Sequence, residues 1–210
     1  MSRDNILHKV RTALGRSAGQ PIPALAPPRL RLPEADPETR IRRFSEALET
    51  QSGKFHRAAS LEDARAYAAA LLAGKTAVAS NAALLRECGI PALDGVRSGV
   101  TGERELRELC ARADVGITSA EYALADTGTL VMFSTAEEAR MISLLPPVHL
   151  AVIRSDRILT GLDELFTLAP LPGERTSSMV LITGPSRTAD IEQILIRGVH
   201  GPGELHVVAI

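Results

Sequence analysis

The chain has 210 residues, a formal net charge of −1 and an apolar content of 45%, of which little is aromatic. This length suffices for one domain with a single aliphatic core. Acidic and basic residues nearly cancel and Trp is absent, so neither a strong positive field nor an aromatic stacking platform is expected. These features exclude nucleic acid as an expected partner.

The N-terminal segment predicts an amphipathic helix. Residues 2–15 carry Ile6, Leu7, Val10 and Leu14 on one face of such a helix. The segment lacks the apolar stretch and cleavage site of a signal peptide, and no apolar run of the chain reaches the ~18 residues of a membrane span. We therefore expect a cytoplasmic protein without a membrane span.

A proline-rich stretch follows this helix. Prolines recur from Pro21 to Pro37 and favour an extended connection over a regular helix. The expected organisation is an N-terminal helix and Pro-rich arm over residues 1–37, and an α/β domain over residues 38–210. The arm's helix is expected to dock on its own domain, on a second copy in a homo-oligomer, or on another subunit.

Helix and strand patterns alternate over the rest of the chain. Segments such as TAVAS, HLAVI and HVVAI are short, apolar and rich in β-branched residues, which is typical of strands covered by helices on both faces. The predicted fold class is α/β, with a mostly parallel sheet layered with helices. Expected helices cover residues 38–50, 61–73, 82–88, 103–112, 137–144, 161–167 and 188–197, and expected strands cover 54–58, 76–80, 114–118, 129–134, 148–153, 178–183 and 205–210.

A glycine-containing turn after the strand at 178–183 is the first candidate site. A helix starting near residue 188 would offer unpaired backbone amides to an anion, beside hydroxyl groups and a guanidinium. Helix capping by Thr188 or Asp190 is the alternative explanation. The candidate residues of this turn are Gly184, Pro185, Ser186, Arg187, Thr188 and Asp190.

The second candidate is the turn Asp126, Thr127, Gly128 and Thr129, preceded by a short segment expected to be helical. Its carboxylate could accept a ligand hydroxyl or act as a base. The alternative is a tight turn in which the Asp126 side chain bonds its own backbone.

The third candidate combines Arg140 and His149 with His200 and Gly201. A cation and a proton carrier at one sheet edge would suit an anionic ligand. The histidine spacing fits no metal site, so no metal is expected, and hydrogen-bonded structural histidines are the alternative. Cys88 and Cys110 are likewise too few and too poorly spaced for an iron–sulfur or zinc site.

The strings ADTGTLV and SLLPPVHLAVI, together with ITGPSRTADIEQILIRGVHGPGELHVVAI, resemble the LUD domain family of the lactate utilization protein C type. The resemblance is close over residues 100–210. It implies a fold like that of the NagB, ribose-5-phosphate isomerase and CoA-transferase group.

The resemblance also implies a function. The chain would be an accessory subunit without clusters or another cofactor of its own, in a system oxidising L-lactate to pyruvate whose iron–sulfur clusters reside in partner subunits. The alternative is a stand-alone enzyme or sensor that binds a small phosphorylated or carboxylated metabolite. In that case Ser186 and Arg187 would hold the anion, and Asp126 or His149 would move a proton.

Overall fold

The computed structural model describes residues 2–17, 19–21, 32–189 and 195–210. By its internal contacts the chain divides into two units, Met1–Arg31 and Leu32–Ile210. No helix in the described parts is long and apolar enough to cross a membrane.

The smaller unit contains the helix α1 (Arg3–Ala13). Ser2 caps it, because its hydroxyl oxygen accepts a hydrogen bond from the Asn5 amide at 3.3 Å. The apolar stripe is exposed: Ile6, Val10 and Leu14 keep 49%, 48% and 66% of their surface accessible. The predicted helix is confirmed, and its docking on its own domain, on a second copy or on another subunit stays a prediction.

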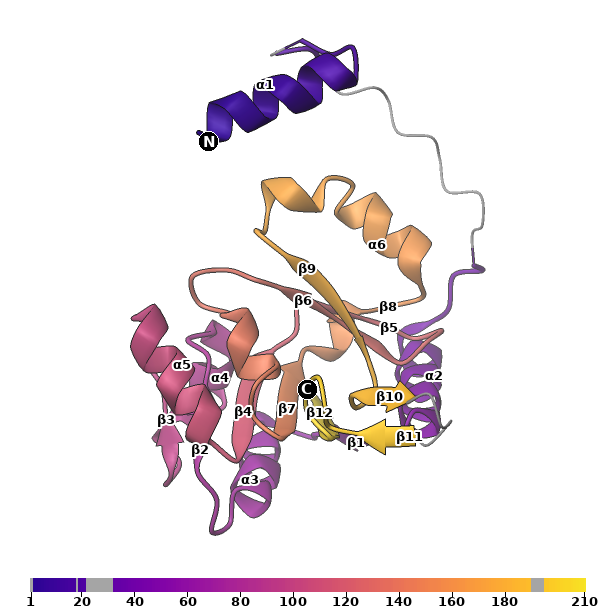
Figure 1. The fold of residues 1–210 in the computed structure, drawn as a ribbon. Coiled ribbons are helices and arrows are strands. Elements are labelled where there is room, and N and C mark those ends of the chain that lie inside the picture. Colours follow the sequence, from indigo (N-terminus) through magenta and orange to yellow (C-terminus); the bar gives the residue numbers. More distant parts are fainter. Residues whose placement is uncertain (1, 18, 22–31, 190–194) are drawn as a thin grey trace. The chain divides into compact units, whose positions relative to one another are not determined.

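The larger unit is built on a six-stranded sheet in which every neighbouring pair is parallel (Figure 1). Its strand order is β1-β12-β7-β4-β2-β3. The strands are β1 (Lys54–Arg57), β2 (Ala77–Ala79), β3 (Val96–Arg97), β4 (Val115–Ser119), β7 (Val148–Ile153) and β12 (Glu204–Ala209). This sheet confirms the predicted α/β class.

A second sheet of four strands has the order β8-β5-β6-β9. β6 is antiparallel to both β5 and β9, whereas β8 is parallel to β5. The strands are β5 (Tyr122–Leu124), β6 (Thr129–Phe133), β8 (Ile158–Leu159) and β9 (Met179–Thr183). The sequence did not predict that these segments leave the central sheet.

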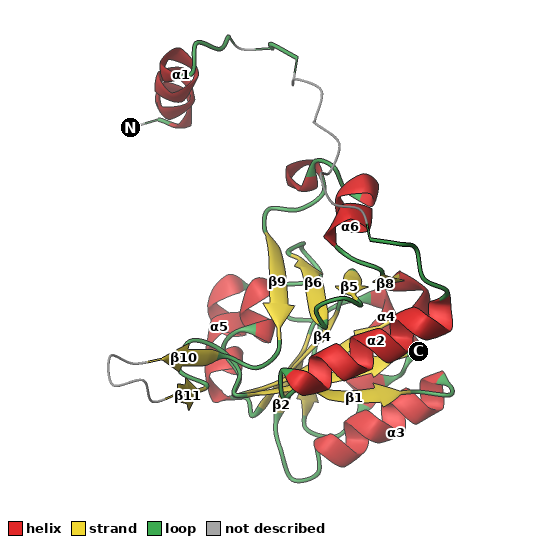
Figure 2. Cartoon of the chain, turned by 90° about the vertical axis from the view of Figure 1, so that its right-hand side faces the viewer, coloured by secondary structure: helices red, strands yellow, loops and turns green. Residues whose placement is uncertain are grey.

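Helices cover the faces of the two sheets. α3 (Leu61–Leu71) and α4 (Ala83–Glu87) share an apolar cluster with one face of the central sheet. α2 (Pro37–Thr50) and the second sheet share a cluster with the other face, where α5 (Glu103–Arg112) also packs. α6 (Leu162–Leu168) packs on the outer side of the second sheet. Figure 2 shows α2 lying across the strands.

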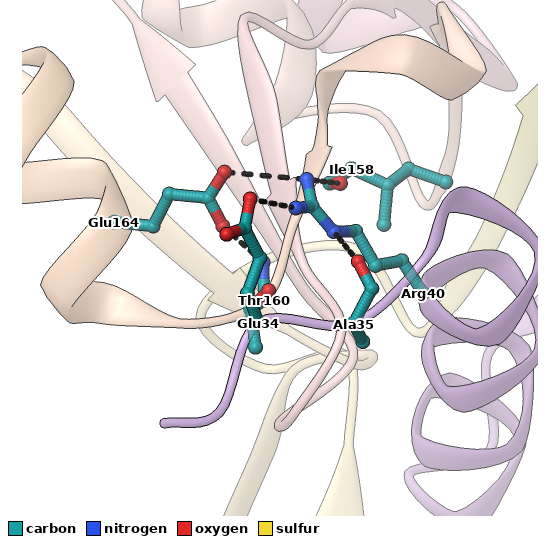
Figure 3. A network of polar contacts seen from close by, with 6 residues as sticks. All are labelled: Glu34, Ala35, Arg40, Ile158, Thr160 and Glu164. Atoms are coloured by element: carbon teal, nitrogen blue, oxygen red, sulfur yellow. Dashed lines mark hydrogen bonds and ion pairs between the residues drawn. The ribbon is translucent and has the colours of Figure 1, made fainter. Parts of the chain in front are cut away.

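Arg40 on α2 is the centre of a polar network that ties α2 to β8 and α6 (Figure 3). Its side chain is only 15% exposed and pairs with Glu164 at 3.2 Å and Glu34 at 3.4 Å. Its Nε donates to the Ala35 carbonyl at 2.7 Å. The other Glu164 oxygen accepts from the Thr160 amide at 2.7 Å. The charge is therefore paired on several sides, as a mostly buried guanidinium requires.

The predicted helix over residues 188–197 is wrong at both of its described ends, and residues 190–194 lie outside the described residues. β10 (Arg187–Ala189) and β11 (Leu195–Arg197) instead form an antiparallel ribbon, in which β-branched Thr188 and Ile196 lie opposite each other. The side chains of Arg187 and Arg197 both donate to Ser52 Oγ at 3.2 Å. These contacts with a distant segment outweigh the local helical pattern.

Two other predicted helical segments also differ. The segment before Asp126 is the strand β5, whose residues are all buried and so show no alternation to distinguish a strand from a helix. The helix predicted over 137–144 is only a 3-10 turn, Arg140–Ser143. Pro146 and Pro147 follow closely and disfavour helical geometry in the residues before them.

Candidate functional site

A cavity of about 280 Å³ lies where the carboxyl end of β9 meets the amino ends of β7 and β12. Charged and hydroxyl side chains from segments far apart in the sequence line it. They include eight of the candidate residues, namely Arg140, His149, Gly184, Pro185, Ser186, Arg187, His200 and Gly201. Ligands of open parallel sheets usually bind at the carboxyl ends of the strands, whereas this cavity lies at the amino ends of two of them.

His149, the second residue of β7, is buried with 1% of its surface exposed. Its Nε2 lies 2.8 Å from Thr118 Oγ1 on the adjacent strand β4 and is hydrogen-bonded to it. Its Nδ1 is buried and has no hydrogen-bond partner among the described residues. Burial, with a smaller contribution from the nearby Arg140 charge, lowers the pKa of His149 to about 3. The ring is therefore neutral at physiological pH, with one nitrogen that has no hydrogen-bond partner among the described residues.

Arg140 opens the 3-10 turn and supplies a half-buried positive charge. Its Nη1 donates to Ser143 Oγ at 2.7 Å, and Ser143 Oγ in turn donates to the Arg140 carbonyl at 3.1 Å. In the part of the chain that the structure describes, no carboxylate lies within ion-pair distance of this guanidinium. Burial lowers the pKa of Arg140, although a guanidinium remains charged. A partly desolvated cation without an acidic partner favours an anionic ligand.

The backbone beneath this site explains why Arg140 is held there. Gly116 on β4 is in register with His149, and a Cβ at Gly116 would lie 1.9 Å from the Ile142 carbonyl oxygen. Only glycine lets the turn approach β4 so closely. Thr118 and Ser143, the hydrogen-bond partners of His149 and Arg140, were missed by the sequence reasoning. The i, i+3 spacing of Ser143 from Arg140 was a signal that could have revealed it.

The turn after β9 differs in structure from the sequence-based expectation. The predicted helix N-terminus is absent from it, because Arg187 begins the ribbon. The Arg187 guanidinium donates to the Gln51 carbonyl. Gly184 has φ +76°, and a Cβ there would lie 2.7 Å from the Gln51 side chain. Ser186 lines the cavity, and its amide donates to the Pro202 carbonyl at 2.8 Å. Packing on the end of α2 thus accounts for Gly184 and Arg187.

Four further candidates follow in the same part of the sequence. His200 is exposed, and Gly201 lies beside Ser186 at the cavity. Thr188 belongs to β10, outside the cavity lining. Asp190 lies outside the described residues.

The turn Asp126–Thr129 lies outside the cavity lining. Gly128 has φ +66°, and a Cβ there would lie 2.4 Å from the Leu48 amide nitrogen, so this turn packs directly on α2. Asp126 accepts a hydrogen bond from the Thr127 hydroxyl at 3.3 Å. The hydroxyls of Thr127, Thr129 and Thr183 then form a chain with spacings of 2.7 and 2.8 Å. Because Thr183 lines the cavity, this chain connects the turn with the site.

The chain is similar to a known domain family and to several bacterial proteins. The sequence model described as "LUD domain" matches residues 41–210. The chain is 42% identical over 105 residues to lactate utilization protein C of Halalkalibacterium halodurans and 38% identical over 105 residues to that of Bacillus subtilis. Each match covers 48% of this chain, and covers 45% and 43% of the two relatives respectively. These matched regions are thus less than half the length of either relative.

A solved structure shows the same fold. The crystal structure of a DUF162 family protein from Deinococcus radiodurans matches with a TM-score of 0.63 at 18% sequence identity. The match covers 83% of this chain and 98% of that one. At this identity the likeness is one of fold.

Proposed function

The chain belongs to the LUD domain family, and from this premise we propose that it is an accessory, cluster-free subunit of an iron–sulfur system that oxidises L-lactate to pyruvate. Relatives named lactate utilization protein C support a role in lactate use. The Arg140 cavity supports binding of a small carboxylate.

Arg140 is the observation that carries the ligand class. Its charge is half-buried and has no acidic partner within the described ranges, so a bound carboxylate would accept hydrogen bonds from it. The buried Nδ1 of His149 supplies a second polar contact for a group that enters deeper. The volume of about 280 Å³ is near the lower end of ligand pockets, which suits a three-carbon acid.

The cysteines support the cluster-free role. Cys88 and Cys110 are the only two in the chain, whereas a common iron–sulfur cluster takes four protein ligands. Both thiols are buried, and burial raises the pKa of Cys110 to about 11, which keeps it protonated. Clusters in partner subunits would accept the electrons released by lactate, while this chain would bind and orient the acid.

A stand-alone enzyme or sensor for a small anionic metabolite is the second candidate. The observation that favours it is that described residues of this chain already bring a cation and hydroxyl groups to the Arg140 cavity. In that case the chain binds its ligand alone and does not depend on iron–sulfur proteins.

Purification of the tagged chain from its native host during growth on L-lactate tests the proposal. Co-elution of proteins with iron–sulfur absorbance, together with loss of growth on lactate after deletion, is the expected result. A chain that elutes alone, with unimpaired growth of the deletion strain, contradicts the subunit role. If the isolated chain then still binds small anions through Arg140, the sensor or enzyme is the better account.

A further inference from the structure

A second cavity, of about 310 Å³, lies at the opposite end of the central sheet from the Arg140 cavity. Its lining includes Ser119 at the end of β4, Arg154 directly after β7 and Ala82 after β2. β2 has β3 on one side and β4 on the other, so the chain reverses its direction across the sheet here. Ligands of open parallel sheets characteristically bind outside the carboxyl ends of the strands at such a reversal.

Glu138 brings a carboxyl group into this place. Its Oε1 accepts hydrogen bonds from Ser80 Oγ and from the Ser119 amide, both at 2.8 Å. Its Oε2 is buried and has no hydrogen-bond partner among the described residues. The carboxyl is therefore held in a fixed orientation by the ends of two strands, and its second oxygen is unpartnered among the described residues.

The surroundings favour the protonated form of this group. Burial raises the pKa of Glu138 to about 7, and the charges of Glu137 and Glu121 contribute in the same direction. The hydrogen bonds from Ser119 and Ser80 act the other way. A carboxyl that is partly protonated near neutral pH can both donate and accept a hydrogen bond, as acid–base groups do.

The remaining charges around the cavity differ in how they are paired. Glu87 pairs with Arg154, and Glu121 pairs with Arg175 at 3.1 Å. Arg157, which also lines the cavity, lies over the Tyr122 ring at 5.6 Å from its centre. No acidic partner of Arg157 occurs in the described ranges. Arg157 is thus the cation of this cavity that is free to meet an anion.

We propose that this cavity is a second ligand site, which binds a small metabolite bearing a hydroxyl and an anionic group. Glu138 Oε2 is the hydrogen-bond partner of the hydroxyl, and Arg157 binds the carboxylate or phosphate. The inference stands on residues of this cavity alone and does not depend on the role in lactate oxidation.

Carbon-13 NMR of the full chain labelled at the glutamate carboxyl carbons tests this site. Glu138→Gln assigns the Glu138 signal, and it keeps the oxygen that accepts from Ser80 and Ser119. The probes are L-lactate and glycerol 3-phosphate, each beside an analogue without hydroxyls, propionate and propyl phosphate. A hydroxyl that donates to the carboxylate favours its charged form, so the hydroxylated probe should lower the Glu138 pKa.

The expected result is a lowered Glu138 pKa with at least one hydroxylated probe and none with its analogue. A response to L-lactate identifies the anion as a carboxylate, and a response to glycerol 3-phosphate identifies it as a phosphate. Arg157→Met should lower the affinity for the responding probe by about tenfold or more, because it removes a charge-assisted hydrogen bond. Arg42→Met, a matched change at an exposed position of α2 outside the cavity lining, should leave its affinity within about twofold because surface charges contribute little.

Three results would overturn the proposal. In the first, the Glu138 pKa does not change with any probe at millimolar concentration. In the second, it changes equally with a hydroxylated probe and with its analogue. In the third, Arg157→Met binds the probe with unchanged affinity. Each is read from the wild-type fold or from an exposed position, so failure to fold does not obscure the answer.

Discussion

Replacing Glu138 by Gln should change how the stability of the protein depends on pH. In the folded chain burial raises the pKa of this carboxyl from the ordinary 4.5 to about 7. Between these values the unfolded chain releases a proton that the folded chain keeps, so the stability that Glu138 contributes is present below about pH 4.5 and is lost as the pH rises to about 7. At about 1.4 kcal/mol per pKa unit, the loss amounts to about 3 kcal/mol.

Urea unfolding of wild type and Glu138→Gln at about pH 4.5 and about pH 8 measures this difference. The variant should gain about 3 kcal/mol relative to wild type between the two conditions, because its amide does not ionise. His149 has a lowered pKa and therefore acts with the opposite sign, but it is present in both proteins and cancels from the comparison. If the difference in unfolding free energy between wild type and Glu138→Gln is the same at both pH values, the raised pKa of Glu138 is refuted.

Three other sets of variants test the Arg40 network, the close approach at Gly116 and the hydrogen bond from Ser80 to Glu138. Arg40→Met should lower the unfolding free energy by about 2–3 kcal/mol in urea titration, because it leaves Glu164 without its cation; an unchanged midpoint would contradict the network. Gly116→Ala should destabilise by about 3 kcal/mol or more through the clash with a backbone carbonyl, and Gly173→Ala, which meets open space, should stay within about 0.5 kcal/mol; similar melting temperatures for both would refute the close approach. Ser80→Ala removes a hydrogen bond that lowers the Glu138 pKa, so carboxyl NMR should show that pKa raised further, and a lowered value would count against the assigned contact.

The sequence was sufficient for the α/β class and for most elements of the central sheet. Short, apolar strands such as Val148–Ile153 and Glu204–Ala209 are recognisable because a strand covered on both faces has few polar positions. The second sheet was not predictable in the same way. Tyr122–Leu124 is as uniformly buried as a helix interior, so no local pattern assigns it to one sheet or the other.

The candidate site was predictable only in part. Arg140 and His149 were selected for their chemistry, and the fold brings both to one cavity. Gly184 was selected as part of an anion-binding turn and Gly128 as part of a turn that carries Asp126, but both glycines are required by the packing of their turns on α2. Glu138 carried no signal, since its burial depends on β2 and β4, which are adjacent only in the folded chain.

Isothermal titration of the purified chain with L-lactate and pyruvate tests most directly whether the Arg140 cavity binds a small carboxylate. Arg140→Met is the test variant, and Arg42→Met is the matched control, because Arg42 lies exposed on α2 in an ion pair with Glu46. The account predicts that at least one acid binds to wild type and to Arg42→Met, and that its affinity falls by about tenfold or more in Arg140→Met. Equal affinity in all three proteins, or no binding to wild type, would contradict it.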